Sequence, residues 1–239
     1  MMTNSKMSSI FTIYKRNEIG RITKLGIFMF ILICAGACSQ DRKKSDNKLP
    51  QSAQQSIRAG KTDGKVKVKK AGGETAFILK LYDDGLKLLD HRENDIARIT
   101  RTKSEKYRIK DAGDNVLGYV TGSSNKFKIV DKTQQLTLFI FQSQSDGDWK
   151  LESLDDEENL LWKVGNRDYG WKIESSTETK LSKVKVKNGR TTITDNNDDT
   201  AFYTNDEYSS LAIVPFTFNQ LTKPQQAALS AALNFDFTN

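Results

Sequence analysis

The sequence predicts a mainly β protein: a closed antiparallel meander barrel of about 12 strands built from repeated hairpins, with an apolar C-terminal helix filling the barrel. Three observations lead to this prediction. A short motif of alternating apolar and polar residues recurs seven times along the chain. Each copy is followed by a second apolar run, in most cases after a turn rich in Gly, Asn or Asp, and the chain ends in a mostly apolar segment.

The first 37 residues have the composition of a secretory signal peptide. An apolar run covers Leu25–Cys34 and is too short to span comfortably the ~30 Å hydrocarbon layer of a bilayer. The small residues Ala35, Gly36 and Ala37 then lead to Cys38. Four basic residues form the positively charged start of this signal: Lys15, Arg16, Arg21 and Lys24.

Small residues directly before Cys38 resemble the bacterial lipobox, and this resemblance implies cleavage before Cys38 and a diacylglyceryl group, with further acylation such as palmitate, at that cysteine. The sequence departs from the motif at Ala35, where lipoproteins usually have Leu. An uncleaved signal anchor and cleavage without lipid are the alternatives. The resemblance implies a place in the cell envelope, and Ser39 favours the outer membrane, on its periplasmic face or surface, in a host with two membranes.

Residues 38–63 are expected to form the lipidated cysteine and a flexible basic tether, since they are polar, rich in Ser and Gln, and without periodicity. About 25 residues of coil reach roughly 25–30 Å. Four cations close to the anchor are candidates for contact with anionic headgroups: Arg42, Lys43, Lys44 and Lys48. The alternative is that this segment is merely a solvated spacer.

Charge is unevenly distributed along the chain, which has a formal net charge of +7. Residues 1–37 carry +4, residues 38–70 carry +7 and residues 71–239 carry −4. The positive charge thus belongs mainly to the signal and the tether, whereas a nucleic-acid groove needs clustered cations on the folded part. We therefore expect no nucleic-acid partner. Cys34 and Cys38 are the only cysteines, so a lipidated Cys38 leaves no disulfide, thiol nucleophile or Cys-based zinc site.

The repeat covers residues 64–207 and sets the predicted fold. Its copies begin 20 to 22 residues apart, at Val66, Leu86, Tyr107, Phe127, Trp149, Trp171 and Thr191. Alternation predicts strands with one buried face, and the turn that separates each copy from its second strand makes each unit a hairpin. We expect the second strands at 76–80, 96–100, 117–121, 136–140, 160–164, 181–186 and 201–204. Closure of such a long meander removes its free edges.

The strands are expected to be too short, and their polar faces too rich in Lys and Arg, for a barrel that spans a membrane. A wide soluble barrel needs something inside it, and residues 208–239 are the candidate. Residues 210–218 are apolar nearly all round, with Pro215 as an expected kink, and their β-branched residues leave helix and strand open. Residues 221–233 predict a helix with Thr222 as N-cap and Gln225 completing a capping box.

The units around Tyr107–Asp111 and Leu117–Val120, together with the terminal SLAIVPF and LTKPQQAAL segments, resemble the tubby C-terminal-like superfamily, in particular LURP-one-related and scramblase-like proteins. The resemblance covers roughly residues 64–235 and implies a twelve-stranded barrel around an apolar C-terminal helix. It also implies contact with lipid. The sequence departs from this pattern in having seven hairpins rather than six, so one unit is expected to be irregular or to lie outside the barrel.

A search for catalytic and metal-binding patterns favours structural roles. His91, the only histidine, falls in an expected turn and lacks a partner for a triad or a zinc site. Three groups of neighbouring carboxylates lie in expected turns, where Asp is favoured for backbone reasons: Asp83–Asp84, Asp155–Glu158 and Asp198–Asp199. The turns at 145–148 and 195–199 could at most bind calcium weakly. Trp149, Trp162 and Trp171 are expected in the core.

We therefore expect no enzyme, no catalytic residues, no metal site and no cofactor. The expected function is a lipid-anchored, non-enzymatic module of the cell envelope that binds lipid or a protein partner. A structural or assembly lipoprotein is one alternative, and an Asp/Glu-dependent hydrolase is another.

Overall fold

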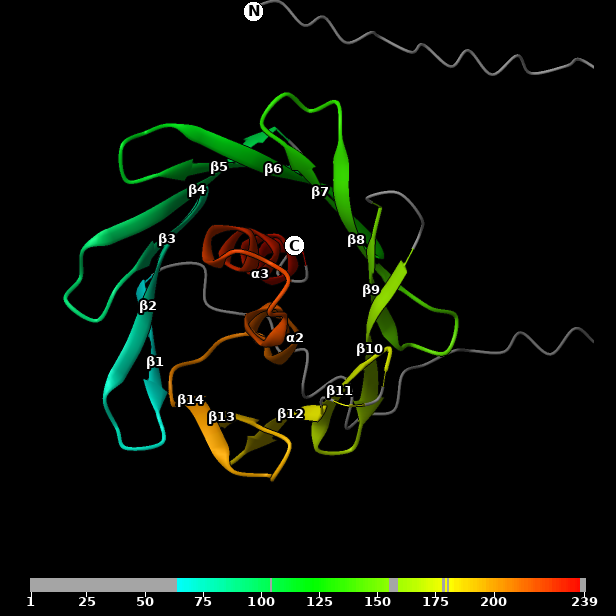
Figure 1. Cartoon of the computed structure of the whole chain (residues 1–239). Coiled ribbons are helices and arrows are strands. Elements are labelled where there is room, and N and C mark those ends of the chain that lie inside the picture. The colour runs from blue at the N-terminus through cyan, green and yellow to red at the C-terminus, as the bar shows by residue number, and fades with distance from the viewer. Residues whose placement is uncertain (1–63, 104, 155–158, 178, 180, 237–239) are drawn as a thin grey trace, which may run out of the picture. The chain divides into compact units, whose positions relative to one another are not determined.

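The computed structural model describes residues 64–103, 105–154, 159–177, 179 and 181–236 (Figure 1). Cys38 and the tether residues Arg42, Lys43, Lys44 and Lys48 lie outside this range. Fourteen strands follow one another: β1 (Gly64–Lys70), β2 (Thr75–Tyr82), β3 (Gly85–Leu89), β4 (Asp95–Lys103), β5 (Lys106–Asp111), β6 (Val116–Ser123), β7 (Lys126–Asp131), β8 (Thr137–Ser143), β9 (Trp149–Ser153), β10 (Asn159–Arg167), β11 (Gly170–Ser175), β12 (Leu181–Lys187), β13 (Arg190–Thr194) and β14 (Thr200–Thr204).

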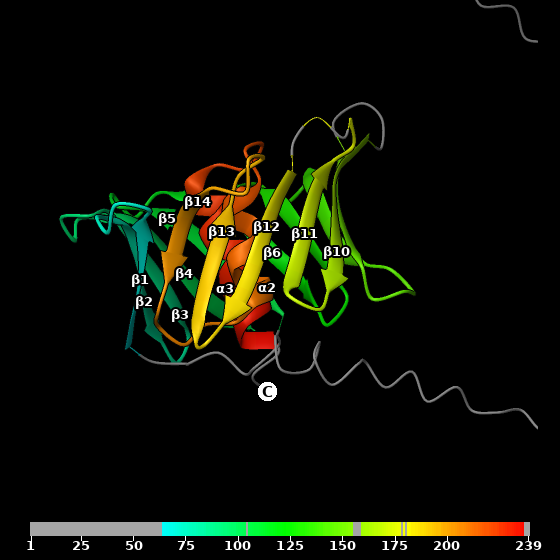
Figure 2. The same cartoon turned by 90° about the horizontal axis from the view of Figure 1, so that it is seen from below.

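The strands form one closed antiparallel barrel in which each pairs with its sequence neighbours and β1 pairs with β14 (Figures 1 and 2). The meander and its closure confirm the predicted fold class. The strand count is 14 rather than about 12, because all seven hairpins are part of the wall. The expectation that one unit is irregular or lies outside the barrel was therefore wrong.

The two ends of the barrel differ in their turns. We call the end at which Gly64 begins β1 the entry rim, and the other end the far rim. At the entry rim most hairpins close with two-residue turns such as Asn188–Gly189, whose positive φ values of 52° and 76° suit the twist of paired strands. At the far rim the turns are longer, and several begin with an aspartate, as Asp111 and Asp195 do.

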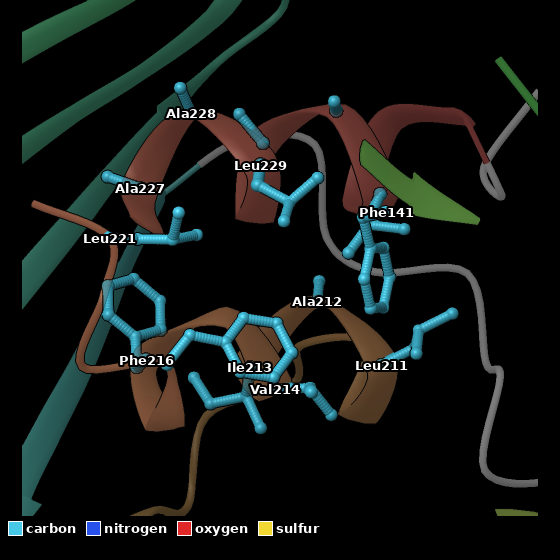
Figure 3. Close-up of a cluster of buried hydrophobic side chains, with 14 of the residues drawn as sticks. Phe141, Leu211, Ala212, Ile213, Val214, Phe216, Leu221, Ala227, Ala228 and Leu229 are labelled. Atoms are coloured by element: carbon cyan, nitrogen blue, oxygen red, sulfur yellow. The ribbon is translucent and has the colours of Figure 1, made fainter. Parts of the chain in front are cut away.

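The C-terminal segment occupies the interior of the barrel (Figure 1). It consists of α2 (Ser210–Ile213), the 3-10 turn η1 (Val214–Thr217) and α3 (Lys223–Asp236). Its side chains pack against one another and against the inner faces of the strands, as Figure 3 shows for Leu211, Phe216 and Leu229. Ten consecutive α3 residues, from Gln226 to Phe235, are buried. The predicted filling of the barrel is confirmed, although by short helices.

Local signals in this segment behave as the sequence predicts. The Thr222 backbone N–H donates to Gln225 Oε1 at 2.9 Å, and the Gln225 N–H donates to Thr222 Oγ1 at 3.5 Å, which completes a capping box. Near Pro215, where a kink was expected, the α-helical turn gives way to a 3-10 turn. The β-branched Ile213 and Val214 left helix and strand open, and the segment is helical.

We call the C-terminal segment inside the barrel, residues 208–236, the plug. Side-chain hydrogen bonds join the wall of the barrel to it. The indole N–H groups of Trp162 and Trp171 donate to Gln220 Oε1 at 2.6 Å and to Ser210 Oγ at 3.1 Å. Within the plug, the Tyr208 and Ser230 hydroxyls are hydrogen-bonded at 2.7 Å, and burial raises the pKa of Tyr208 above its ordinary value. Trp149, Trp162 and Trp171 are all buried, which confirms the prediction that they belong to the core.

Candidate functional site

The outer wall of the barrel carries its most distinctive surface chemistry. Because the plug and the inward-facing side chains pack together in the interior, the accessible side chains lie on the outside of the strands and at the two rims. We therefore built the candidate site from the outward-facing positions.

Positive and negative charges are segregated between the strands and their connections. Of the 26 Lys and Arg residues from residue 64 to the C-terminus, 22 lie in the described strands, whereas only 5 of the 26 Asp and Glu residues do. The reason is local: Lys and Arg occupy the outward positions of the alternating repeat, and Asp caps the turns. The wall is consequently basic and the rims are acidic, although the net charge of this part of the chain is close to zero.

The wall of β1–β5 shows how dense the positive charge is. The strand register places five cations directly opposite one another in one row: Lys65, Lys80, Lys87, Arg98 and Lys110. Directly opposed like charges destabilise a sheet. Three carboxylates reduce the repulsion: Glu93 contacts Lys65 at 2.6 Å, Asp95 contacts Lys87 at 2.9 Å, and Asp114 contacts Lys110 at 3.4 Å.

The next sector, on β5–β7, is less well compensated. Among the described residues, Arg108 and Lys128 have no carboxylate within 4.0 Å. Arg108 lies opposite Tyr119, and Lys128 lies opposite Thr121, so the two cations flank β6. The Arg108 Nε is buried without a hydrogen-bond partner. Neither cation forms an ion pair within the described residues, so the charge of each is uncompensated there.

An apolar surface adjoins these cations on the outer face of β6–β8. Leu117 is 45% exposed and Leu136 is 53% exposed. Val130 and Ile140 are buried but do not belong to the core cluster, and their pairing with the outward-facing Tyr119 and Lys128 places them on the outer face. Leu138 is two residues from Ile140 and shares its face. The apolar sector is defined by these residues: Leu117, Val130, Leu136, Leu138 and Ile140.

Aspartates at the far rim hold turns together. Asp90 Oδ1 accepts the N–H groups of Arg92 and Asn94, both at 2.8 Å, and Asp111 Oδ1 accepts that of Asn115 at 2.8 Å. Hydrogen bonds, above all from the side chains of Asn94 and Asn115, lower the pKa of both aspartates. These carboxylates therefore stabilise the backbone.

An open hollow of about 470 Å³ lies at the far rim, lined by Trp162, Ser182, Asp195, Asn196, Asn197, Thr217 and Asn219. Several of its polar groups already have partners. Asn196 Oδ1 accepts the Leu181 N–H, Asp195 Oδ1 accepts the Asn197 N–H, and the Trp162 indole donates to Gln220. The first two bonds lie within the rim, and the third connects the wall to the plug.

The remaining candidates from the sequence are scattered. His91 lies in the β3–β4 turn, where its Nε2 accepts from Arg92 Nε at 3.2 Å. The carbonyl of Asp84 accepts the Arg101 N–H, and Asp198 pairs with Lys183 and Lys185. Asp148 Oδ1, in the 145–148 turn, accepts the Asn166 N–H. The structure does not bring these groups together, and residues 155–158 lie outside the described part.

The sequence analysis placed Lys and Arg on the polar faces of the strands, but it missed their segregation from the carboxylates and it missed the apolar sector. The net charge of residues 71–239 concealed the segregation, which only the alternation of Lys and Arg within each strand could have revealed. The apolar sector had a signal in β8, where TLFIFQS runs apolar through four residues instead of alternating. Such a run indicates a strand with apolar residues on both faces.

We compared the chain with models of protein families, with curated proteins and with solved structures, and none of the three comparisons gives a significant match. The resemblances to the lipobox and to tubby-like proteins therefore stay predictions. No helix in the described ranges is both long and apolar enough to cross a bilayer. Within the same ranges, no three His, Cys, Asp or Glu side chains form a group that could hold a metal ion.

Proposed function

We propose that this protein is a lipid-anchored, non-enzymatic module of the cell envelope whose basic barrel wall contacts the anionic headgroups of a phospholipid membrane. The observation that carries the proposal is the charge segregation, with 22 of 26 cations in the strands. Because the interior is packed with the plug, the wall is the surface on which an external anion is most strongly attracted.

The physical scale of the attraction fits a tethered module. Each Lys or Arg close to an anionic membrane contributes about 1 kcal/mol, and the contribution falls off within a Debye length. A diacylglyceryl group at Cys38 would supply two acyl chains, which are enough for stable anchoring. The cations of the barrel wall, together with Arg42, Lys43, Lys44 and Lys48, would then hold the tethered barrel close to the headgroups.

Vesicle co-sedimentation tests the lipid contact. The chain from Ser39 onward, which has neither signal nor lipid, is mixed with vesicles of phosphatidylcholine alone or with one third phosphatidylglycerol. We expect binding to the anionic vesicles that weakens as salt increases. Arg108→Gln with Lys128→Gln should weaken it further, whereas Lys172→Gln, whose ammonium already pairs with Glu174 at 2.7 Å, is the matched control.

Absence of binding to anionic vesicles at low salt would reject the lipid contact. That result would favour the alternative of a structural or assembly lipoprotein with a protein partner.

Labelling with a palmitate analogue tests the anchor in a lipoprotein-exporting host. The full chain should incorporate the label, Cys38→Ala should abolish incorporation, and Cys34→Ala should leave it unchanged. Labelling that persists in Cys38→Ala, or that is lost in Cys34→Ala, would contradict the assignment.

A further inference from the structure

We propose that the apolar sector of β6–β8 inserts into the interfacial layer of an anionic bilayer, while Arg108 and Lys128 bind the phosphates of adjacent lipids. This inference rests on the proposed function and deepens it, because it selects one side of the barrel as the docking face. Its occupant is a phospholipid surface.

Exposed apolar residues meet at one place on this face. Leu117 and Leu136 are two of the three large hydrophobic residues classed as exposed among the described residues, and Val186 is the third. Gly118 pairs with Asp131, which puts Leu117 beside the β7–β8 turn, and the Asp131 N–H donates to the Leu136 carbonyl at that turn. A single exposed leucine is ordinary, whereas two that adjoin further outward apolar residues form a contact surface.

The layer below the two leucines is also apolar. Val130 and Ile140 occupy outward positions of β7 and β8, as Ile78 and Leu89 do on β2 and β3, whereas most other outward positions of the wall have charged or polar residues. Val130 is directly opposite Tyr119, and the ammonium of Lys106 lies 4.7 Å from the centre of the Tyr119 ring. Tyrosine and lysine side chains are typical of residues at the level of the headgroups, because each joins an apolar body to a polar end.

Cations border the apolar sector on the side of β5 and β7. Arg108 and Lys128 lack a carboxylate partner among the described residues, and the buried Arg108 Nε lacks any hydrogen-bond partner. Apolar side chains beside uncompensated cations are complementary to a bilayer, in which acyl chains lie just below a layer of phosphates. A protein partner would have to match both features in the same order.

The test uses the absence of cysteine after Cys38. In the chain from Ser39, Leu136→Cys is labelled with an environment-sensitive NBD group, and Val186→Cys, on β12 at the other side of the barrel, is the control (Figure 1). Addition of vesicles containing one third phosphatidylglycerol should shift the emission of the label at position 136 to shorter wavelength and increase its intensity. The label at position 186 should change little.

Partitioning measures the contribution of the two leucines. Leu117→Ser with Leu136→Ser should reduce binding to the same vesicles by about ten-fold or more, because two half-exposed leucines no longer transfer to the apolar layer. Val186→Ser should bind as the unsubstituted chain does, and the three proteins should have the same near-UV circular dichroism.

The outcomes separate this inference from the proposed function. If the unsubstituted chain does not bind anionic vesicles, both fail. A second outcome is that the unsubstituted chain binds and that salt weakens this binding, but the double serine variant binds equally well or the label at position 136 stays in water. In that case the docking face is wrong and the general lipid contact stands.

Discussion

Asp198 shows how a single carboxylate stabilises the far rim. It accepts hydrogen bonds from Lys183 Nζ at 2.7 Å, from Lys185 Nζ at 3.2 Å and from Thr194 Oγ1 at 3.3 Å. These bonds lower the pKa of Asp198 from an ordinary value of 3.8 to about 2. The bond from Lys183 is the largest cause, and the bond from Lys185 is the next. The same bond raises the pKa of Lys183.

The lowered pKa makes part of the stability dependent on pH. Because the folded state holds the Asp198 proton less tightly than the unfolded state, the stabilisation is complete above pH 3.8 and is lost as the pH falls towards about 2. We expect carboxyl NMR titration of Asp198 to show a midpoint well below 3.8. We also expect the stability difference between the unsubstituted chain and Asp198→Asn to shrink across this range, and a constant difference would contradict the assignment.

Gly170 is a position in the wall that does not accept a residue with a side chain. Its φ of +131° is unfavourable for other residues, and a Cβ atom there would lie 2.2 Å from the Val184 carbonyl oxygen of the neighbouring strand. We predict that Gly170→Ala lowers the free energy of unfolding by roughly 2–4 kcal/mol. Urea denaturation measures the loss.

Gly72→Ala is the control for this prediction, because no atom lies within 4 Å of the added methyl group. It should change the stability by less than about 0.5 kcal/mol. Equal stability of the two alanine variants would show that the β11–β12 contact tolerates a side chain.

At the scale of the elements, the repeat predicted most of the fold. Each of the seven motif starts lies in an odd-numbered strand, because alternation and turn chemistry are local properties of the sequence. The strand count was less predictable, since it came from a family pattern that this chain exceeds by one hairpin. Bulges such as that between Leu160 and Trp162 depend on contacts across strands and had no signal in the periodicity.

The candidate site was less predictable than the fold, for a physical reason. Which cations face one another depends on register, and a row such as Lys80, Lys87 and Arg98 is visible only when three strands are aligned. The exposure of Leu117 and Leu136 likewise depends on the turn between β7 and β8.

The pairing that closes the barrel is the shortest of its ladders. β1 and β14 share the register pairs Lys69–Tyr203 and Lys70–Phe202, and beyond them the Lys67 N–H donates to Asp206 Oδ2 at 2.6 Å. The Asp206 side chain thus replaces a strand partner at the point where the ladder ends.

We predict that amide hydrogen exchange is faster in β1 and β14 than in β5 and β6, which share five register pairs. Asp206→Ala should accelerate amide exchange around Lys67 about three- to ten-fold, because the Lys67 N–H loses a charged acceptor. Asp168→Ala, in the β10–β11 turn, is a control expected to leave β1 unchanged. Equal protection of all the strands would contradict the prediction.

At the scale of the whole molecule, wall and plug depend on each other. Fourteen strands enclose more space than their own side chains fill, and Leu211, Leu229 and Leu233 of the plug are completely buried. Without the plug, the inner faces of the strands would be exposed to water or would have to collapse.

We therefore predict that a chain ending at Glu207 does not form the native barrel. It should lose the near-UV circular dichroism of Trp162 and Trp171, whose indole N–H groups bond to the plug, and should bind a hydrophobic dye. A peptide of residues 208–239 added in trans is expected to restore part of the signal. A truncated chain with native spectra and cooperative unfolding would contradict the architecture.

The pairing of the first strand with the last also determines the order of folding. During synthesis from the N-terminus, β1 has its β2 partner early, but its other edge stays open until Thr200–Thr204 has appeared. The plug follows later still, so completion of the interior is a late, long-range event and folding should be slow. A chain with this topology is most vulnerable to aggregation while its sheet is nearly complete but its first and last strands are not yet paired.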